Sequence, residues 1–211
     1  TGDSKLRTAA AKAVQFAEWS QSDLRGWRYE PQEDADTSVT GWFVMVLETA
    51  KMAGLSVDEQ KLQNVHQFLN SVANDDLSEY AYNSFERPSL SMTAEAMLCR
   101  IMLGWNRTEP PLLKAISTDF LPTAPRIDDE PTSVYYFYYA TQVLHHVGGD
   151  AWNEWNTAMK ATFPRTQVKT GPEAGSWDPD KDIYASAGGR LYTTALHIYC
   201  LEVYYRHLSI Y

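Results

Sequence analysis

The sequence predicts an all-α fold in which four helical hairpins stack on one another. Apolar residues recur at the 3.6-residue spacing of helices along most of the chain, between loops rich in glycine, proline and aromatic residues. Thr40, Thr93 and Thr194 occupy matching places, each followed by Gly or Ala and then by apolar residues, and the segment from Pro131 to Tyr136 fills the missing place. Four units averaging roughly fifty residues are typical of arrays of helical pairs.

The helices follow from apolar spacing and from the residues that begin and end them. Asp36 or Thr37 is a plausible N-cap, and Gly54, Gly104 and the pair Gly148–Gly149 are good stops. The run of tyrosines from 135 to 139 favours a strand locally, but its place in the repeat predicts a helix. The expected helices are residues 5–19, 38–53, 58–72, 90–103, 110–116, 132–147, 150–163 and a last one from the pair Gly188–Gly189 to Tyr205.

In each pair, a more polar helix precedes a more apolar one. Such pairs cannot bury their apolar faces alone, so the apolar helices are expected inside and the polar helices outside, in an arc or a ring. The last helix is apolar on nearly every side, which predicts that it is enclosed on every face. We expect residues 1–211 to form a single domain.

Composition and charge narrow the functional classes. The 211 residues are 44% hydrophobic, with 7 Trp and 13 Tyr, which allows a sizeable core. The net charge of −9 argues against a sequence-independent nucleic-acid binder and against docking on anionic lipids. No apolar run reaches the roughly 18–20 residues that span a bilayer, so no membrane span is expected. Cys99 and Cys200 fall in apolar helices and are expected to be buried thiols.

The chain begins with Thr1 and not with Met, so we expect a piece of a longer chain, and the localisation stays open. The possible partners are an apolar small molecule, a second copy of the chain, and the rest of the parent chain.

Two segments, Asp36–Trp42 and Gly189–Leu196, resemble the inner helices of bacterial squalene-cyclase-like repeat proteins. These proteins belong to the α/α-toroid family of terpene cyclases and protein prenyltransferases. Gly26-Trp27 and Gly175-Ser176-Trp177 stand in the family's Gly-x-Trp loop positions, with Gln21 and Gln167 loosely before them. The resemblance implies a toroid or a partial toroid around a hollow that holds an apolar, isoprenoid-like ligand.

The resemblance also implies candidates for a catalytic acid. Family cyclases of the protonation type carry an Asp-x-Asp-Asp-Thr-Ala element, whose central Asp is the acid. With Thr37 placed on the Thr of this element, Asp36 takes the last Asp and Ala35 takes the place of the acid. Ala35 cannot donate a proton, so the candidates are Asp36 itself or Asp34, presented by a bulged loop. The alternative, which we favour, is that Asp36 and Thr37 cap the helix and that Glu33 and Asp34 favour its positive end.

Metal sites are not expected. Family prenyltransferases bind zinc through Asp, Cys and His, and here His197 and Cys200 share a helical face. A zinc site needs three or four ligands, and no third one lies nearby in the sequence; Cys99 and Asp182 could approach only if the fold brings them there. Asp178–Asp182 starts like a calcium loop but lacks the Gly and the Glu that complete one. We therefore predict no metal and no cofactor.

Aromatic residues are the candidates for ligand contacts. In family cyclases such rings line the cavity and stabilise cations, whereas the simpler interpretation is ordinary core. The candidates are Trp42, Tyr135, Tyr138, Tyr139, Trp177, Tyr192 and Tyr199.

Three functional hypotheses follow. The first is a squalene-cyclase-like repeat domain that binds an apolar ligand without catalysing by itself. The second is an active isoprenoid cyclase with Asp36 or Asp34 as the acid. The third is a protein-interaction scaffold that binds a partner segment on a concave face.

Overall fold

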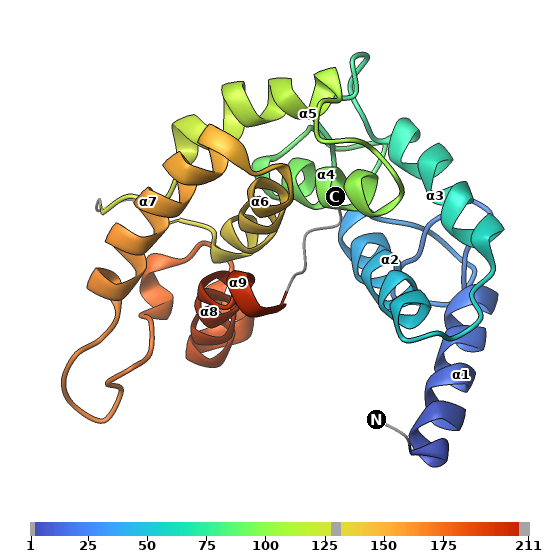
Figure 1. Cartoon of the computed structure of the whole chain (residues 1–211), viewed down its shortest axis with the longest axis horizontal. Coiled ribbons are helices and arrows are strands. Elements are labelled where there is room, and N and C mark those ends of the chain that lie inside the picture. The colour runs from blue at the N-terminus through green and yellow to red at the C-terminus, as the bar shows by residue number, and fades with distance from the viewer. Residues whose placement is uncertain (1–2, 128–131, 207–211) are drawn as a thin grey trace. The chain divides into compact units, whose positions relative to one another are not determined.

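The computed structural model describes residues 3–127 and 132–206, and it divides the chain into two compact units, Thr1–Asn106 and Arg107–Tyr211. Within these described ranges every regular element is a helix, and extended pairing is confined to isolated bridges (Figure 1). The all-α prediction is therefore confirmed. None of the helices in this part of the chain is long and apolar enough to cross a membrane.

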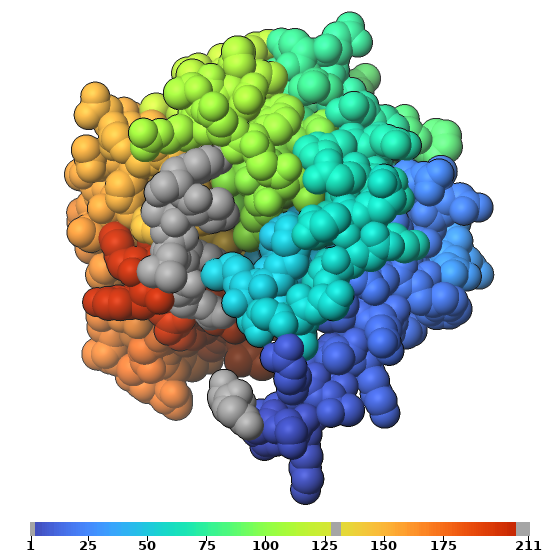
Figure 2. Space-filling view, turned by 45° about the vertical axis from the view of Figure 1, so that its right-hand side comes forward, coloured from blue at the N-terminus to red at the C-terminus, as the bar shows by residue number. Residues whose placement is uncertain are grey.

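Unit 1 is built around α2. Its helices are α1 (Ser4–Trp19), α2 (Thr37–Met52), α3 (Glu59–Ser71) and α4 (Leu90–Met102). Helix α2 contacts the other three, and its most extensive packing is with α4. Every residue of α4 from Ser91 to Ile101 is buried. In contrast, α1 buries only Val14 and Ala17, and α3 exposes its polar face, whose turquoise side chains lie on the surface in Figure 2. The more polar helix is the outer one, as predicted for this unit.

Unit 2 is built in the same way around α6. Helix α5 (Pro110–Ala115) continues into a π turn and a 3-10 turn that end at Thr123. Helices α6 (Val134–Val147) and α7 (Gly149–Thr166) follow, then a short 3-10 turn, η3 (Pro179–Lys181), and the helices α8 (Ala185–Leu201) and α9 (Val203–Arg206). Helix α6 contacts α7, α8 and α9. The tyrosine run is helical, as the repeat predicted.

The prediction that the last helix is enclosed on every face is wrong. Helix α8 buries only Ala185, Thr193, Leu196 and Cys200. Leu191 is 82% exposed and Ile198 is 40% exposed. The physical reason is that α8 packs mainly on α6, α9 and η3 within its unit, which leaves much of the helix surface uncovered. The enclosed inner helix of this unit is α6, which is buried at every residue from Tyr136 to Leu144.

The three matching threonines have one structural role. The backbone N–H of an aromatic loop residue donates to the threonine Oγ1 in each case. The pairs are Trp27 with Thr40 at 3.0 Å, Tyr80 with Thr93 at 3.0 Å, and Trp177 with Thr194 at 3.2 Å. This bond fixes each loop to the helix that follows it, so the repeat seen in the sequence is a repeated hydrogen bond in the structure.

The remaining inner helix, α6, departs from this pattern. Ser133 is the N-cap of α6, and its carbonyl accepts a hydrogen bond from the N–H of Phe137. In unit 1, the carbonyls of the N-caps Asp36 and Ser89 accept in the same way from the N–H groups of Thr40 and Thr93. Phe137 therefore occupies the position of the threonine. Pro131, the first residue of the predicted repeat segment, lies outside the described residues.

Candidate functional site

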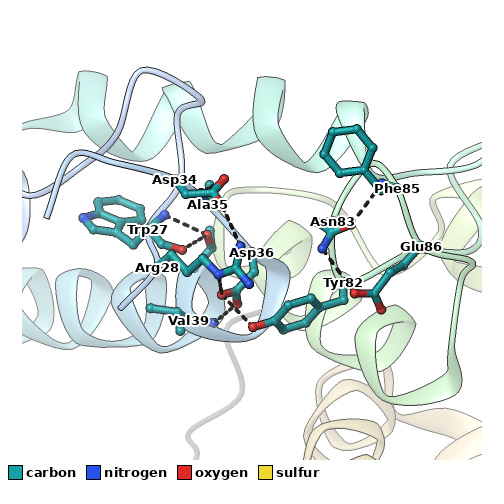
Figure 3. Close-up of polar contacts among 11 residues, drawn as sticks. Trp27, Arg28, Asp34, Ala35, Asp36, Val39, Tyr82, Asn83, Phe85 and Glu86 are labelled. Atoms are coloured by element: carbon teal, nitrogen blue, oxygen red, sulfur yellow. Dashed lines mark hydrogen bonds and ion pairs between the residues drawn. The ribbon is translucent and has the colours of Figure 1, made fainter. Parts of the chain in front are cut away.

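The acidic cluster in unit 1 caps α2. Asp36 is fully buried, and its carboxylate accepts from the backbone N–H of Val39 at 2.7 Å and from the hydroxyl of Tyr82 at 2.9 Å. The Nε of Arg28 lies 3.5 Å from the same carboxylate (Figure 3). Burial raises the pKa of Asp36, while the hydrogen bonds from Val39 and Tyr82 and the charge of Arg28 oppose that rise. The N-cap prediction is confirmed.

Asp34 lies in a different environment from Asp36. Its carboxylate accepts from the N–H of Ala35 at 2.8 Å and forms an ion pair with Arg28 at 2.5 Å. The hydrogen bond from Ala35, followed by that from Arg28, lowers the pKa of Asp34. A lowered pKa favours the carboxylate, whereas a general acid must hold a proton. A hollow of about 290 Å³ borders Asp34, Glu33 and Arg28 and does not reach Asp36.

The better enclosed hollow belongs to unit 2. It has a volume of about 370 Å³, and its apolar wall is formed by Phe137 from α6, Phe163 from α7, and Trp177 and His197 from the last repeat. The side chains of Phe137, Phe163 and Trp177 are 5%, 1% and 4% exposed, so they are fixed parts of the core that present an edge to the hollow. We call this hollow the aromatic cavity.

Trp177 is held in place from several sides. Its indole N–H donates to the carbonyl of Phe163 at 3.0 Å, and its own carbonyl accepts from the hydroxyl of Thr193 at 3.0 Å. Arg190 also donates to that carbonyl and forms an ion pair with Glu173. These bonds hold Trp177 in the wall of the aromatic cavity.

His197 completes the wall. Its ring stacks on Trp177 with centroids 4.7 Å apart and planes 5° apart, and it forms a T-shaped pair with Phe163, with centroids 4.8 Å apart. Its Nδ1 lies 2.8 Å from the carbonyl oxygen of Thr193. Burial lowers the pKa of His197 to about 4, so the imidazole is neutral at pH 7.

Charged residues form the rim of the aromatic cavity. Arg126, Lys181, Asp178 and Asp182 line it, two of each sign. Asp182 accepts from the backbone N–H of Val134 at 2.6 Å and of Tyr184 at 2.8 Å. Burial raises the pKa of Asp182, and these hydrogen bonds oppose the rise. Its carboxylate therefore fixes the rim to the start of α6.

Of the seven aromatic residues proposed from the sequence, the aromatic cavity includes Trp177 and none of the other six. Tyr135, Tyr138, Tyr139 and Tyr199 pack on one another, with ring centroids 4.9–6.0 Å apart. This cluster joins α6 to α8. The remaining two candidates are separate from it: Trp42, in unit 1, is 40% exposed, and Tyr192 is half-buried on α8.

Sequence reasoning missed that Phe137, Phe163 and His197 line this hollow, and it weighed His197 only as a metal ligand. One signal was available for Phe137, because a phenylalanine replaces the repeated threonine at that position of α6. Cys200, the other metal candidate, is buried, and burial raises the pKa of its thiol to about 12. In the part of the chain that the structure describes, no three His, Cys, Asp or Glu residues gather closely enough to hold a metal ion.

Comparison of the chain with protein-family models and with curated proteins gives no match.

Proposed function

We propose that the aromatic cavity of unit 2 binds a small apolar molecule of isoprenoid type. The observation that carries this proposal is a hollow of about 370 Å³ whose apolar wall is already fixed by Phe137, Phe163 and Trp177. Cavities of roughly 300–1,000 Å³ lined by aromatic side chains with a few polar groups are the usual form of small-molecule sites. The resemblance of the sequence to squalene-cyclase-like repeats supports an isoprenoid as the ligand class.

Pre-organisation favours binding here. Trp177 is fixed by hydrogen bonds to Phe163, Thr193 and Thr194, so a ligand need not order it. A ten-carbon alcohol at about 0.6 kcal/mol per non-hydrogen atom would have a Kd on the order of 10 µM. Binding of such a ligand would involve unit 2 alone, and it would require no reaction in the aromatic cavity.

We also propose that the four helical pairs belong to a toroid-like array. The support is the loop-to-threonine hydrogen bond, which occurs twice in unit 1 and again in unit 2. A repeated bond of this kind gives successive pairs the same local geometry.

A filling substitution tests ligand binding. Val168 lines the aromatic cavity, and its backbone N–H and C=O bond to Ser176 and Gly175, so the side chain is replaceable without loss of these bonds. Titration calorimetry with geraniol on the full chain should give a measurable Kd for the wild type and a Kd at least tenfold higher for Val168→Trp. Val46→Trp is the matched control, because Val46 lies in unit 1 and is 51% exposed.

The control variant should bind geraniol as the wild type does. If geraniol does not bind to the wild type, or if Val168→Trp binds it unchanged, the aromatic cavity is not the site.

A second candidate function is an isoprenoid cyclase with Asp36 as the acid. The observation in its favour is the burial that raises the pKa of this carboxyl group. Formation of a cyclic product from an isoprenoid substrate, abolished in Asp36→Asn, would support it.

A further inference from the structure

We propose that the ligand of the aromatic cavity carries a hydroxyl group, and that this hydroxyl donates a hydrogen bond to Nε2 of His197. This inference rests on the proposed function, because it names the polar group of the apolar molecule that the cavity holds. It assigns His197 to ligand recognition and not to catalysis.

The first step is the tautomer of His197. Its Nδ1 lies 2.8 Å from the backbone carbonyl oxygen of Thr193, one helical turn earlier. A carbonyl oxygen only accepts hydrogen bonds, so Nδ1 must carry the proton. In the neutral ring, Nε2 then presents a lone pair, and it is an acceptor.

The second step is that this acceptor is open. Within the described residues, the hydrogen bond to Thr193 is the one that His197 makes through its ring. The ring cannot rotate away to find another partner, because Trp177 covers one face and Phe163 packs against it at a steep angle, with planes 75° apart. His197 lines the aromatic cavity, and Nε2 has no hydrogen-bond donor among the residues that the structure describes.

The third step concerns the neighbouring polar groups, which already donate elsewhere. On the wall formed by α7, α8 and Trp177, the hydroxyl of Thr162 donates to the carbonyl of Pro125, and that of Thr166 donates to the carbonyl of Thr162. The indole N–H of Trp177 donates to the carbonyl of Phe163. This wall therefore offers an acceptor and has no donor left for a ligand.

The last step selects a neutral donor. An apolar ligand that covers His197 would take Nε2 out of contact with water, and a ligand O–H would replace the hydrogen bond that is lost. On this wall a charged ammonium would lose its hydration against three aromatic rings and meet a neutral imidazole, since the carboxylates of Asp178 and Asp182 belong to the rim. An alcohol with an apolar hydrocarbon chain matches both the aromatic rings of the wall and the Nε2 acceptor of His197.

The test compares two probes that share one apolar body. Geraniol has the hydroxyl, and geranyl methyl ether has the same chain with no donor. Calorimetry on the full chain at pH 7.5 should give a Kd for geraniol about fivefold to tenfold lower than for the ether, as expected for one hydrogen bond. In His197→Phe, which keeps a ring on Trp177 and removes Nε2, the two probes should bind with nearly equal Kd.

His145→Phe is the matched control. His145 lies on α6 against Trp152 and does not line the cavity, so this variant should keep the wild-type ratio. Equal binding of both probes to the wild type would overturn the hydroxyl inference and leave the proposed function intact. This comparison uses the wild-type protein alone, so it does not depend on whether a variant folds. A ratio retained in His197→Phe would overturn the assignment to Nε2. Failure of both probes to bind would overturn the proposed function itself.

Discussion

At the scale of single residues, Asp36 has a measurable role as a cap. Its carboxylate accepts from Val39 and Tyr82 in a fully buried position. Asp36→Ala should lower the free energy of unfolding by about 1–3 kcal/mol, because a buried N–H and a hydroxyl lose their acceptor. Asp36→Asn should cost less, because the amide oxygen still accepts and Asn is a good N-cap. Urea unfolding followed by circular dichroism measures both values.

The same pair of variants separates the cap from the acid. Asn cannot serve as a proton donor of useful strength, so Asp36→Asn removes an acid while it keeps the cap. If Asp36→Asn is as unstable as Asp36→Ala, the negative charge beside Arg28 contributes more to the free energy of unfolding than the cap does.

At the scale of elements, the packing of α2 on α4 depends on Gly41. A Cβ at this position would lie 2.2 Å from Oε1 and 2.7 Å from Cγ of Glu95, which is fully buried on α4. Gly41→Ala should therefore lower the free energy of unfolding by about 1–3 kcal/mol, although alanine is the better helix former. Thr49→Ala, at an exposed site of the same helix, is the control and should change stability by less than about 0.5 kcal/mol.

Removing the obstruction tests the cause. In the double variant Gly41→Ala, Glu95→Ala, the alanine at 41 should cost less than it does alone, because the side chain that it meets is gone. Additive losses would mean that the two helices do not meet in this way.

The helices themselves could be predicted from the sequence, because caps and apolar spacing are local. Residues 90–103 were expected, and α4 is Leu90–Met102; the tyrosine run of α6 is likewise a helix. The exposure of Leu191 could not be predicted, because periodicity gives the faces of a helix and not the number of its neighbours. The cavity could not be predicted either, since Phe137, Phe163 and Trp177 are separated by many residues and meet only through packing.

At the scale of the whole molecule, the hydrogen bond from a loop N–H to a threonine hydroxyl recurs in both units. The aromatic cavity borders only the copy that involves Trp177. Trp27 and Trp177 each donate an indole N–H to the last turn of the preceding outer helix and a backbone N–H to a threonine. The bond thus serves the fold generally, and in unit 2 it also positions a wall of the ligand site.

Matched threonine substitutions separate these two roles. Thr40→Val and Thr194→Val each leave a tryptophan N–H without its acceptor, so each should lower the free energy of unfolding by about 1–3 kcal/mol. Thr194→Val should also raise the Kd for geraniol about threefold to tenfold, because Trp177 is then less firmly fixed and the ligand must order it. Thr40→Val should leave that Kd unchanged, since its loop lies in unit 1. Calorimetry gives the Kd for geraniol, and urea unfolding of the same samples gives the free energy of unfolding. An equal rise in Kd for the two variants would show that loss of stability, and not the position of Trp177, controls binding.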